Sequence, residues 1–296
     1  MKLANRVQVL FFILGFISVF LTVQVRAESN SKYKYENFLV TKAKAEQGDA
    51  GAQNLLGTMY LSGIRSKVPR DNMKAVHWFT KAAKQGNASA QFHLGARYYR
   101  GEGVPQDYKK AVHWYTKAAE QGNANAQFSL AAKYFDGEGV PQDNMKAVHW
   151  FTKAAEQGEA RAQSLLGRIY YNGLRVPQDY KKAVHWFTNA AEQGEVRAQS
   201  LLGGMYYNGE GVPQDNMKAV HWFTKAADQG DVKAQSLLGI MYYKGEGVSQ
   251  NYVKAYVLLN LAASQGNATS KYNKEILLTQ MSSSQIEEGK KLSKQL

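Results

Sequence analysis

The sequence contains no cysteine and only five prolines in 296 residues. The absence of cysteine excludes disulfide bonds, so the fold must be stabilised by side-chain packing alone. The prolines are not scattered: each follows a valine in the same segment of a recurring pattern, so each marks a turn between elements.

Recognisable catalytic motifs are also missing. There is no phosphate-binding loop, no H-E-x-x-H pair and no cysteine–histidine constellation. Two S-x-x-K matches begin at Ser29 and Ser31, but no S-D-N or K-T-G follows them, as it does in penicillin-interacting enzymes. We therefore expect a protein that is not an enzyme and that uses no cofactor and no small-molecule substrate.

Acidic residues are too few to balance the basic ones, because 24 Asp and Glu accompany 37 Lys and Arg and give a formal net charge of +13. Such a balance can indicate nucleic-acid binding. Here, however, the lysines recur opposite an apolar helix face, as Lys109, Lys110, Lys117 and their copies. Glu120 and its counterparts lie between them. We interpret them as a solvated surface and expect no nucleic-acid partner, although a basic face favours weak association with an anionic membrane surface.

What the sequence does contain is repetition. Its tryptophans recur at intervals of 36 residues: Trp78, Trp114, Trp150, Trp186 and Trp222. A period of this size predicts a stacked repeat array. The segment 104–122 (VPQDYKKAVHWYTKAAEQG) predicts a helix with Asp107 as its N-cap and Gly122 just beyond its end. The tryptophan lies on the apolar face of this helix, so we expect Trp150, in mid-array, to be buried.

A second helix precedes this one in each copy, as in the segment 90–100 (AQFHLGARYYR). Ala90, Leu94 and Tyr98 share one face, and Gly95 lets a neighbouring backbone come close. Helices of about three turns cannot bury an apolar face alone, so stacked copies must share a core. We call the two helices of each copy A and B, and the predicted fold is an all-α solenoid of helix-turn-helix units.

The pattern A-Q-x-x-L-G-x-x-Y-x-x-G-x-G-V-P-Q-D-x-x-K-A-x-x-W-x-x-K-A-A-x-Q-G resembles the SEL-1-like repeat, a relative of the tetratricopeptide (TPR-like) repeat. The resemblance covers roughly residues 48–296 and is specific because the motif repeats in register. It implies a right-handed α/α superhelix that acts as an adaptor between proteins, often outside the bacterial cytoplasm. It does not imply one activity.

Four regions follow from this pattern. Residues 1–27 have a basic start, an apolar run and small residues before a cleavage site after Ala27, which predicts a signal peptide and export to the periplasm, the cell surface or the medium. An uncleaved membrane anchor is the less favoured alternative. Residues 28–47 are predicted to be an N-terminal half-repeat cap, and residues 266–296 to be C-terminal capping helices. Between them lie six repeats: 48–85, 86–121, 122–157, 158–193, 194–229 and 230–265.

Three repeats depart from the pattern, and the first of them is two residues longer, with the extra length between Ile64 and Val68. In the fourth, Leu174 and Arg175 replace the Glu-Gly of the turn, and in the sixth, Leu258 stands where tryptophan is expected. Terminal repeats are commonly atypical because their outer face meets water or a cap. For the last helix, 285–295, we expect Ser284 and Glu287 to form a capping box.

Histidines precede the tryptophans in five repeats, which raises the possibility of a metal site: His77, His113, His149, His185 and His221. Equivalent positions in successive repeats are two helix-packing distances apart, much farther than the about 2 Å between zinc and a ligand nitrogen. We therefore expect these histidines and His93 to lie at the surface or at the rim of the core.

The remaining candidate is a binding surface on the A helices. One ladder of positions varies from repeat to repeat: Thr58, Ala96, Ala132, Arg168, Gly204 and Ile240. A second variable ladder consists of Asn54, Phe92, Phe128, Ser164, Ser200 and Ser236. Beside them runs an aromatic row that begins with Leu61 and continues with Tyr99, Phe135, Tyr171, Tyr207 and Tyr243. In tetratricopeptide-type arrays the A helices line the concave side, where aromatic side chains serve as anchors. The alternative is that the row packs between helices as part of the scaffold. The protein-binding candidates are Phe92, Tyr99, Phe128, Phe135, Arg168, Tyr171, Tyr207 and Tyr243.

The sequence therefore predicts an exported, non-enzymatic scaffold that binds a protein or peptide in the concave groove of a repeat solenoid. By family analogy alone, we expect a role in envelope function or host interaction. The alternative is a peptidoglycan-directed or β-lactamase-like hydrolase, for which the S-x-x-K pairs would have to be functional.

Overall fold

The computed structural model describes residue 34 and the ranges 36–64 and 67–294. The predicted signal peptide and both S-x-x-K serines lie outside the described residues. Contacts divide the chain into two compact bodies, one up to Gln142 and one from Asp143 onward, and each is described by itself. We call them the N-terminal body and the C-terminal body.

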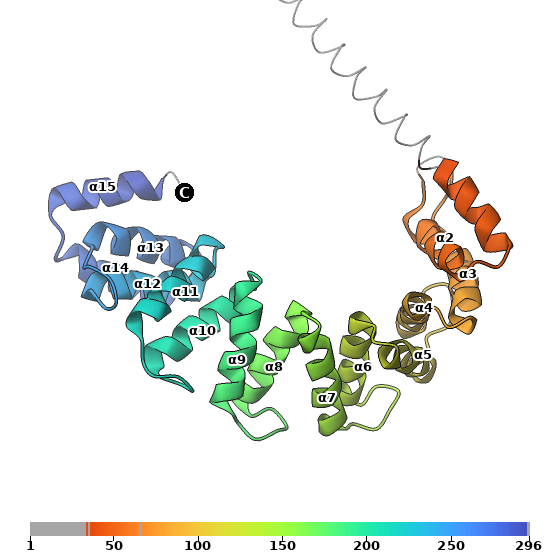
Figure 1. The fold of residues 1–296 in the computed structure, drawn as a ribbon. Coiled ribbons are helices and arrows are strands. Elements are labelled where there is room, and N and C mark those ends of the chain that lie inside the picture. Colours follow the sequence, from red (N-terminus) through yellow and green to blue (C-terminus); the bar gives the residue numbers. More distant parts are fainter. Residues whose placement is uncertain (1–33, 35, 65–66, 295–296) are drawn as a thin grey trace, which may run out of the picture. The chain divides into compact units, whose positions relative to one another are not determined.

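Within its described residues, the chain is helical apart from turns and one isolated bridge between Ile64 and Val68 (Figure 1). The N-terminal body contains a helix over residues 36–46 and then α2 (Ala50–Ser62), α3 (Asn72–Lys84), α4 (Ala88–Arg100), α5 (Tyr108–Glu120) and α6 (Ala124–Asp136). The C-terminal body contains α7 (Asn144–Glu156), α8 (Ala160–Asn172), α9 (Tyr180–Glu192), α10 (Val196–Asn208), α11 (Asn216–Asp228), α12 (Val232–Lys244), α13 (Tyr252–Ser264), α14 (Ala268–Leu278) and α15 (Ser283–Ser293). The all-α, helix-turn-helix prediction is confirmed.

The helix starts follow from their capping residues. Asp107 is the N-cap of α5, and its Oδ1 accepts a hydrogen bond of 2.9 Å from the backbone N–H of Lys110, as predicted. Gly122 follows the helix with φ +87°, in the region that glycine adopts without strain. The A helix of the same repeat begins at Ala88, two residues earlier than predicted, because Asn87 caps it through the backbone N–H of Ala90.

The turns between A and B helices contain a second glycine because they pass very close to the backbone of the preceding B helix. A Cβ added to Gly211 would lie 2.6 Å from the backbone oxygen of Tyr180, at the start of the preceding B helix. The turn can therefore approach that helix only without a side chain. In the fourth repeat the same position is Arg175, whose φ of +63° makes it the one non-glycine with positive φ among the described residues.

The core lies between A and B helices, which pack in pairs such as α8 with α9 and α10 with α11 (Figure 1). Phe223 of α11 is fully buried, and its ring lies so close to α10 that a Cβ on Gly203 would be 2.8 Å from it. Phe79, Phe151 and Phe187 are buried in the same register. The preceding tryptophan lies nearer the edge of this core: Trp222 is buried, but Trp150 is only half-buried, so the expectation of a buried Trp150 was wrong.

A ladder of buried glutamines ties neighbouring repeats together. Gln199 of α10 donates from Nε2 to the carbonyl of Ala191 at the end of the preceding B helix, at 3.1 Å. Its Oε1 accepts a hydrogen bond from Gln229 at 2.9 Å. Because a buried amide is costly without partners, this glutamine fixes the register of each A helix against two B-helix ends.

The two ends of the array are covered by short elements. Phe38 of the helix over 36–46 packs edge-on against Tyr60, with ring centroids 5.6 Å apart. At the other end α15 packs on α13, where a Cβ on Gly289 would lie 2.6 Å from the ring of Tyr256.

The capping box of α15 was predicted two residues too late. It is formed by Ser282 and Gln285, and the helix begins at Ser283. Ser284 and Glu287 therefore lie inside the helix, because the serine that precedes the first helical turn is the one that reaches the free N–H groups. No helix in the described part of the chain is long and apolar enough to cross a membrane.

Candidate protein-binding surfaces

The aromatic row is half-buried along its whole length rather than exposed. In the N-terminal body, the ring of Tyr99 lies 5.5 Å from that of Tyr108 and has the ammonium of Lys133 at 3.7 Å from its centroid. Lys133 is itself paired with Glu138 in the turn of its own repeat. The ring centroids of Phe92 and Tyr115 are 6.0 Å apart. Phe128, which corresponds to Phe92, and Phe135, which corresponds to Tyr99, are both half-buried.

In the C-terminal body, the tyrosine hydroxyls of the row bond to the next turn or cap. Burial, together with a hydrogen bond to Glu210 in the next turn, raises the pKa of Tyr171 to about 12. The hydroxyl of Tyr207 donates to Glu246 Oε2 at 2.8 Å, and this bond raises the pKa of Tyr207. Tyr243 accepts a hydrogen bond from Gln280 Nε2 at 2.8 Å. These three tyrosines therefore connect each repeat to its successor, and a role in partner binding stays a prediction for them.

The variable ladder presents a different environment. Arg168 of α8 is half-buried, yet its guanidinium forms no ion pair or side-chain hydrogen bond with any residue that the structure describes. A Cβ placed on Gly204 of α10 would meet nothing within 4 Å, so the helix surface is open there. Ile240 of α12 is the next residue of the ladder and is half-buried. We call the variable ladder that contains Arg168 the A-helix ladder. In the C-terminal body it combines a charge without an ion-pair partner, a helix surface that is open at Gly204, and an apolar side chain.

The basic surface is partly occupied by contacts within the protein. Lys110 Nζ lies 3.3 Å from the carboxylate of Asp107 and 5.4 Å from the ring centroid of Tyr98. The backbone N–H of Lys110 bonds to Asp107, and this bond lowers the pKa of that carboxyl. Lys117 lies over the ring of Trp114 at 5.4 Å. These lysines are exposed, as predicted, but they also stabilise the B helix on which they stand.

Each of the five histidines before a tryptophan is exposed and packs against the edge of that tryptophan, as His221 does against Trp222 at 5.0 Å. His93 is half-buried instead of exposed. It is stacked on Phe79 with centroids 4.9 Å apart, and burial lowers its pKa. Among the described residues, no group of three His, Cys, Asp or Glu side chains is placed to hold a metal ion.

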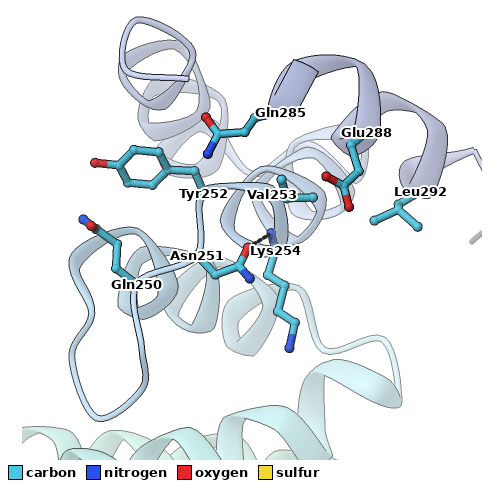
Figure 2. Close-up of a pocket in the computed structure, with 8 residues that line it drawn as sticks. All are labelled: Gln250, Asn251, Tyr252, Val253, Lys254, Gln285, Glu288 and Leu292. Atoms are coloured by element: carbon cyan, nitrogen blue, oxygen red, sulfur yellow. Dashed lines mark hydrogen bonds between the residues drawn. The ribbon is translucent and has the colours of Figure 1, made fainter. Parts of the chain in front are cut away.

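Two depressions lie at the C-terminal end of the array, and sequence reasoning predicted neither. The first, about 480 Å³, is drawn in Figure 2. The first turn of α13 and the residues before it, including Tyr252 and Lys254, form one side, and Gln285, Glu288 and Leu292 of α15 form the other. Asn251 caps α13 here by accepting from the backbone N–H of Lys254 at 2.9 Å. The lining of this first depression is mostly polar.

The second depression, about 340 Å³, shares Lys254 and Leu292 with the first and is more apolar. We call it the Leu258 depression. Its remaining lining residues come from α11, α12 and α13: Thr224, Asp228, Leu238, Tyr242, Val257 and Leu258. The sequence did contain a sign of this feature, because Leu258 is the position at which the tryptophan period breaks.

Sequence reasoning also missed the glutamine ladder. The sign was present, since glutamine recurs at the same A-helix position of every repeat: Gln53, Gln91, Gln127, Gln163, Gln199 and Gln235. A polar residue on a predicted apolar face needs a buried partner, and that partner is a main-chain carbonyl that no sequence pattern reveals.

Comparison with known proteins places these features in a family. The Sel1 repeat profile matches six consecutive stretches, each of which begins two residues after the boundary that we predicted, at or next to the start of an A helix. They are 50–87, 88–123, 124–159, 160–195, 196–231 and 232–267.

Solved structures and a curated protein are similar over parts of their length. The crystal structure of c5321, a protective antigen present in uropathogenic Escherichia coli strains, is 42% identical, with a TM-score of 0.75, over 82% of this chain and 52% of that one. A Sel1 repeat protein from Oxalobacter formigenes is 34% identical, with a TM-score of 0.59, over 73% of this chain and 86% of that one. The Arabidopsis thaliana ERAD-associated E3 ubiquitin-protein ligase component HRD3A is 38% identical over 68 residues, 23% of this chain and 10% of HRD3A.

This chain therefore spans about a tenth of the length of the curated relative and about half of the E. coli protein. The family profile, in contrast, covers most of the chain in six unbroken copies, and their helices are those of the structure. The chain belongs to the Sel1 repeat family, whose members are generally protein-interaction scaffolds.

Proposed function

We propose that this protein is an exported, non-enzymatic scaffold that binds a protein or peptide through the A-helix ladder of its C-terminal body. The observation that carries the proposal is Arg168, a half-buried residue whose guanidinium has no ion-pair partner among the described residues. A guanidinium without a partner in its own chain can donate charge-assisted hydrogen bonds to an acidic or carbonyl group of a ligand.

The neighbouring residues of the ladder support the same proposal. The surface at Gly204 leaves room for a ligand to approach the helix backbone, and Ile240 offers apolar area beyond it. Arginine is enriched among the residues that dominate binding energy at protein interfaces. We expect Arg168 to supply most of the binding energy of this surface, and the half-buried tyrosines beside it to hold the repeats in place.

Export and a role in the cell envelope or in host contact are part of this proposal. The N-terminal segment has the composition of a signal peptide, and the E. coli protein described above is a protective antigen. HRD3A, which is a component of a larger ligase, illustrates a Sel1-type protein acting within an assembly. The hydrolase alternative depends on Ser29 and Ser31, which lie outside the described residues, and no observation favours it.

The test begins with a photoreactive amino acid at position 204, introduced into the full chain in intact cells of the source organism. We expect one protein to be crosslinked reproducibly, and the mass of the recovered chain reports whether cleavage occurs after Ala27. Binding of that purified protein is then compared between the wild type and Arg168→Ala. We expect a loss of at least tenfold, about 1.4 kcal/mol.

The matched control is Lys181→Ala, which removes an exposed positive charge from α9 instead of the A-helix face. Because both changes remove one charge, a purely electrostatic attraction would respond equally to either. Equal losses, or a loss with Lys181→Ala alone, would show that the basic outer surface is the binding face. Tyr171 and Tyr207 are left intact in this test because both bond to the next turn.

A further inference from the structure

The fifth and sixth repeats build the same cluster of buried side chains, 36 residues apart, except at one position. In the fifth, Trp222 packs with Ala183, Phe187, Ala190, Ala191, Ala198, Leu202 and Met205. In the sixth, Leu258 packs with Ala219, Phe223, Ala226, Ala227, Ala234, Leu238 and Met241. These buried members are chemically identical pair by pair. Four residues that line the Leu258 depression also have identical counterparts one repeat earlier: Thr224, Leu238, Tyr242 and Lys254. Besides Leu258, the lining differs in Asp228, which replaces a glutamate, in Val257, which replaces His221, and in Leu292, which comes from α15.

The change leaves space unfilled. Trp222 is only 9% exposed, and Lys225 Nζ lies over its ring at 5.0 Å. In the sixth repeat Leu258 is half-buried, and Leu261 stands where that lysine would be. The Leu258 depression, about 340 Å³, opens at this point. A leucine side chain is smaller than an indole and cannot occupy the volume that the surrounding residues provide.

The lining of the depression has the character of a side-chain binding site. Leu238 at its base is 3% exposed, and Tyr242, Val257 and Leu258 extend the apolar wall. Asp228 at the edge supplies a carboxylate, the kind of acceptor that an indole N–H requires. An apolar cavity with a few polar groups at its edge is typical of ligand sites.

We propose that the Leu258 depression binds an aromatic side chain, tryptophan above all, presented by a partner protein. The occupant is inferred from the protein itself, because Leu238 and Tyr242 of the lining correspond to Leu202 and Tyr206 one repeat earlier, and those two residues belong to the cluster that holds the indole of Trp222. The inference rests on the proposed function only in taking the partner to be a protein, and its surface is separate from the A-helix ladder.

The test uses N-acetyl-tryptophanamide as the probe and the full chain, with binding followed by NMR. We expect saturable binding at one site, with shifts at Tyr242 and Leu258, and binding of N-acetyl-leucinamide at least tenfold weaker. The variant Leu258→Trp restores the side chain of the other repeats. It should abolish probe binding and raise the melting temperature, because the cavity is filled by a residue that its neighbours already accommodate in the fifth repeat.

The converse variant is Trp222→Leu, which gives the fifth repeat the residue of the sixth and should raise the number of probe sites from one to two. Unchanged probe affinity in Leu258→Trp, or equal affinity for the two probes, would overturn the proposal. Removal of residues 295–296 distinguishes an internal occupant: a tenfold gain in probe affinity would show that the chain's own end fills the depression. These measurements need no partner protein, so they stand whether or not Arg168→Ala weakens partner capture.

Discussion

The fifth and sixth repeats show which parts of this repeat fix the backbone and which are free to change. Both keep the buried glutamine and the close glycine contact, with Gly203 facing Phe223 and Gly239 facing Leu259. They differ where the fifth has Trp222 and the sixth has Leu258, and the helices keep the same length regardless. The tryptophan position therefore adds stability without determining the fold, and its loss converts packed core into an accessible depression.

Truncating both residues to alanine should give the largest difference in unfolding free energy between the two repeats. Trp222→Ala removes a buried indole and should lower the free energy of unfolding of the C-terminal body by about 3–5 kcal/mol. Leu258→Ala removes a half-buried side chain beside an existing depression and should cost less than about 2 kcal/mol. Urea unfolding monitored by circular dichroism measures both values, and equal costs would mean that Leu258 fills its site as completely as Trp222 does.

Alanine substitutions at two adjacent glycines of α10 should change stability by smaller amounts and in opposite directions. Gly203→Ala places a Cβ 2.8 Å from the ring of Phe223 and should destabilise the protein by about 1–3 kcal/mol through overpacking. Gly204→Ala meets nothing within 4 Å and should stabilise it by about 0.5–1 kcal/mol, because alanine loses less backbone entropy in a helix. The same unfolding experiment applies, and a destabilising Gly204→Ala would contradict an open surface at the A-helix ladder.

The smallest effect concerns the bond between the two repeats. Tyr207→Phe removes the hydrogen bond to Glu246 and should cost about 0.5–1 kcal/mol at neutral pH, since the bond is only partly buried. The folded-state pKa of Tyr207 is raised above the unfolded value of about 10, so its contribution is complete below pH 10 and is lost as the pH rises through the folded value. Melting temperatures of wild type and variant should therefore converge above pH 10, and a constant difference would assign the cost to packing.

Much of this architecture could be predicted from residues that act locally. Asp107 caps its helix through the N–H three residues later, and Gly122 ends it, because capping and positive φ depend on the immediate chain neighbours. The capping box of α15 was misplaced by two residues because several serines in succession, Ser282 to Ser284, offer the same local chemistry. Which of these serines becomes the N-cap of α15 depends on where α14 ends.

The candidate site was predicted less well, because side chains that look alike in sequence meet different neighbours. From the sequence, Tyr171, Tyr207 and Tyr243 could be either binding anchors or scaffold residues that pack between helices, and the structure shows that their hydroxyls bond to the next turn or to the cap. Gly203 and Gly204 are adjacent and identical in sequence, but one faces Phe223 and the other faces open space.

The sequence by itself determined the repeat, its helices and their caps, since a period of 36 residues and short-range hydrogen bonds require no knowledge of distant partners. The tertiary structure alone decided that the glutamines are bonded to main-chain carbonyls, that Arg168 is left without a partner among the described residues, and that a depression opens beside Leu258. Those properties depend on what a neighbouring helix brings within about 4 Å, and packing distances between helices are set by every side chain at the contact rather than by the residue in question.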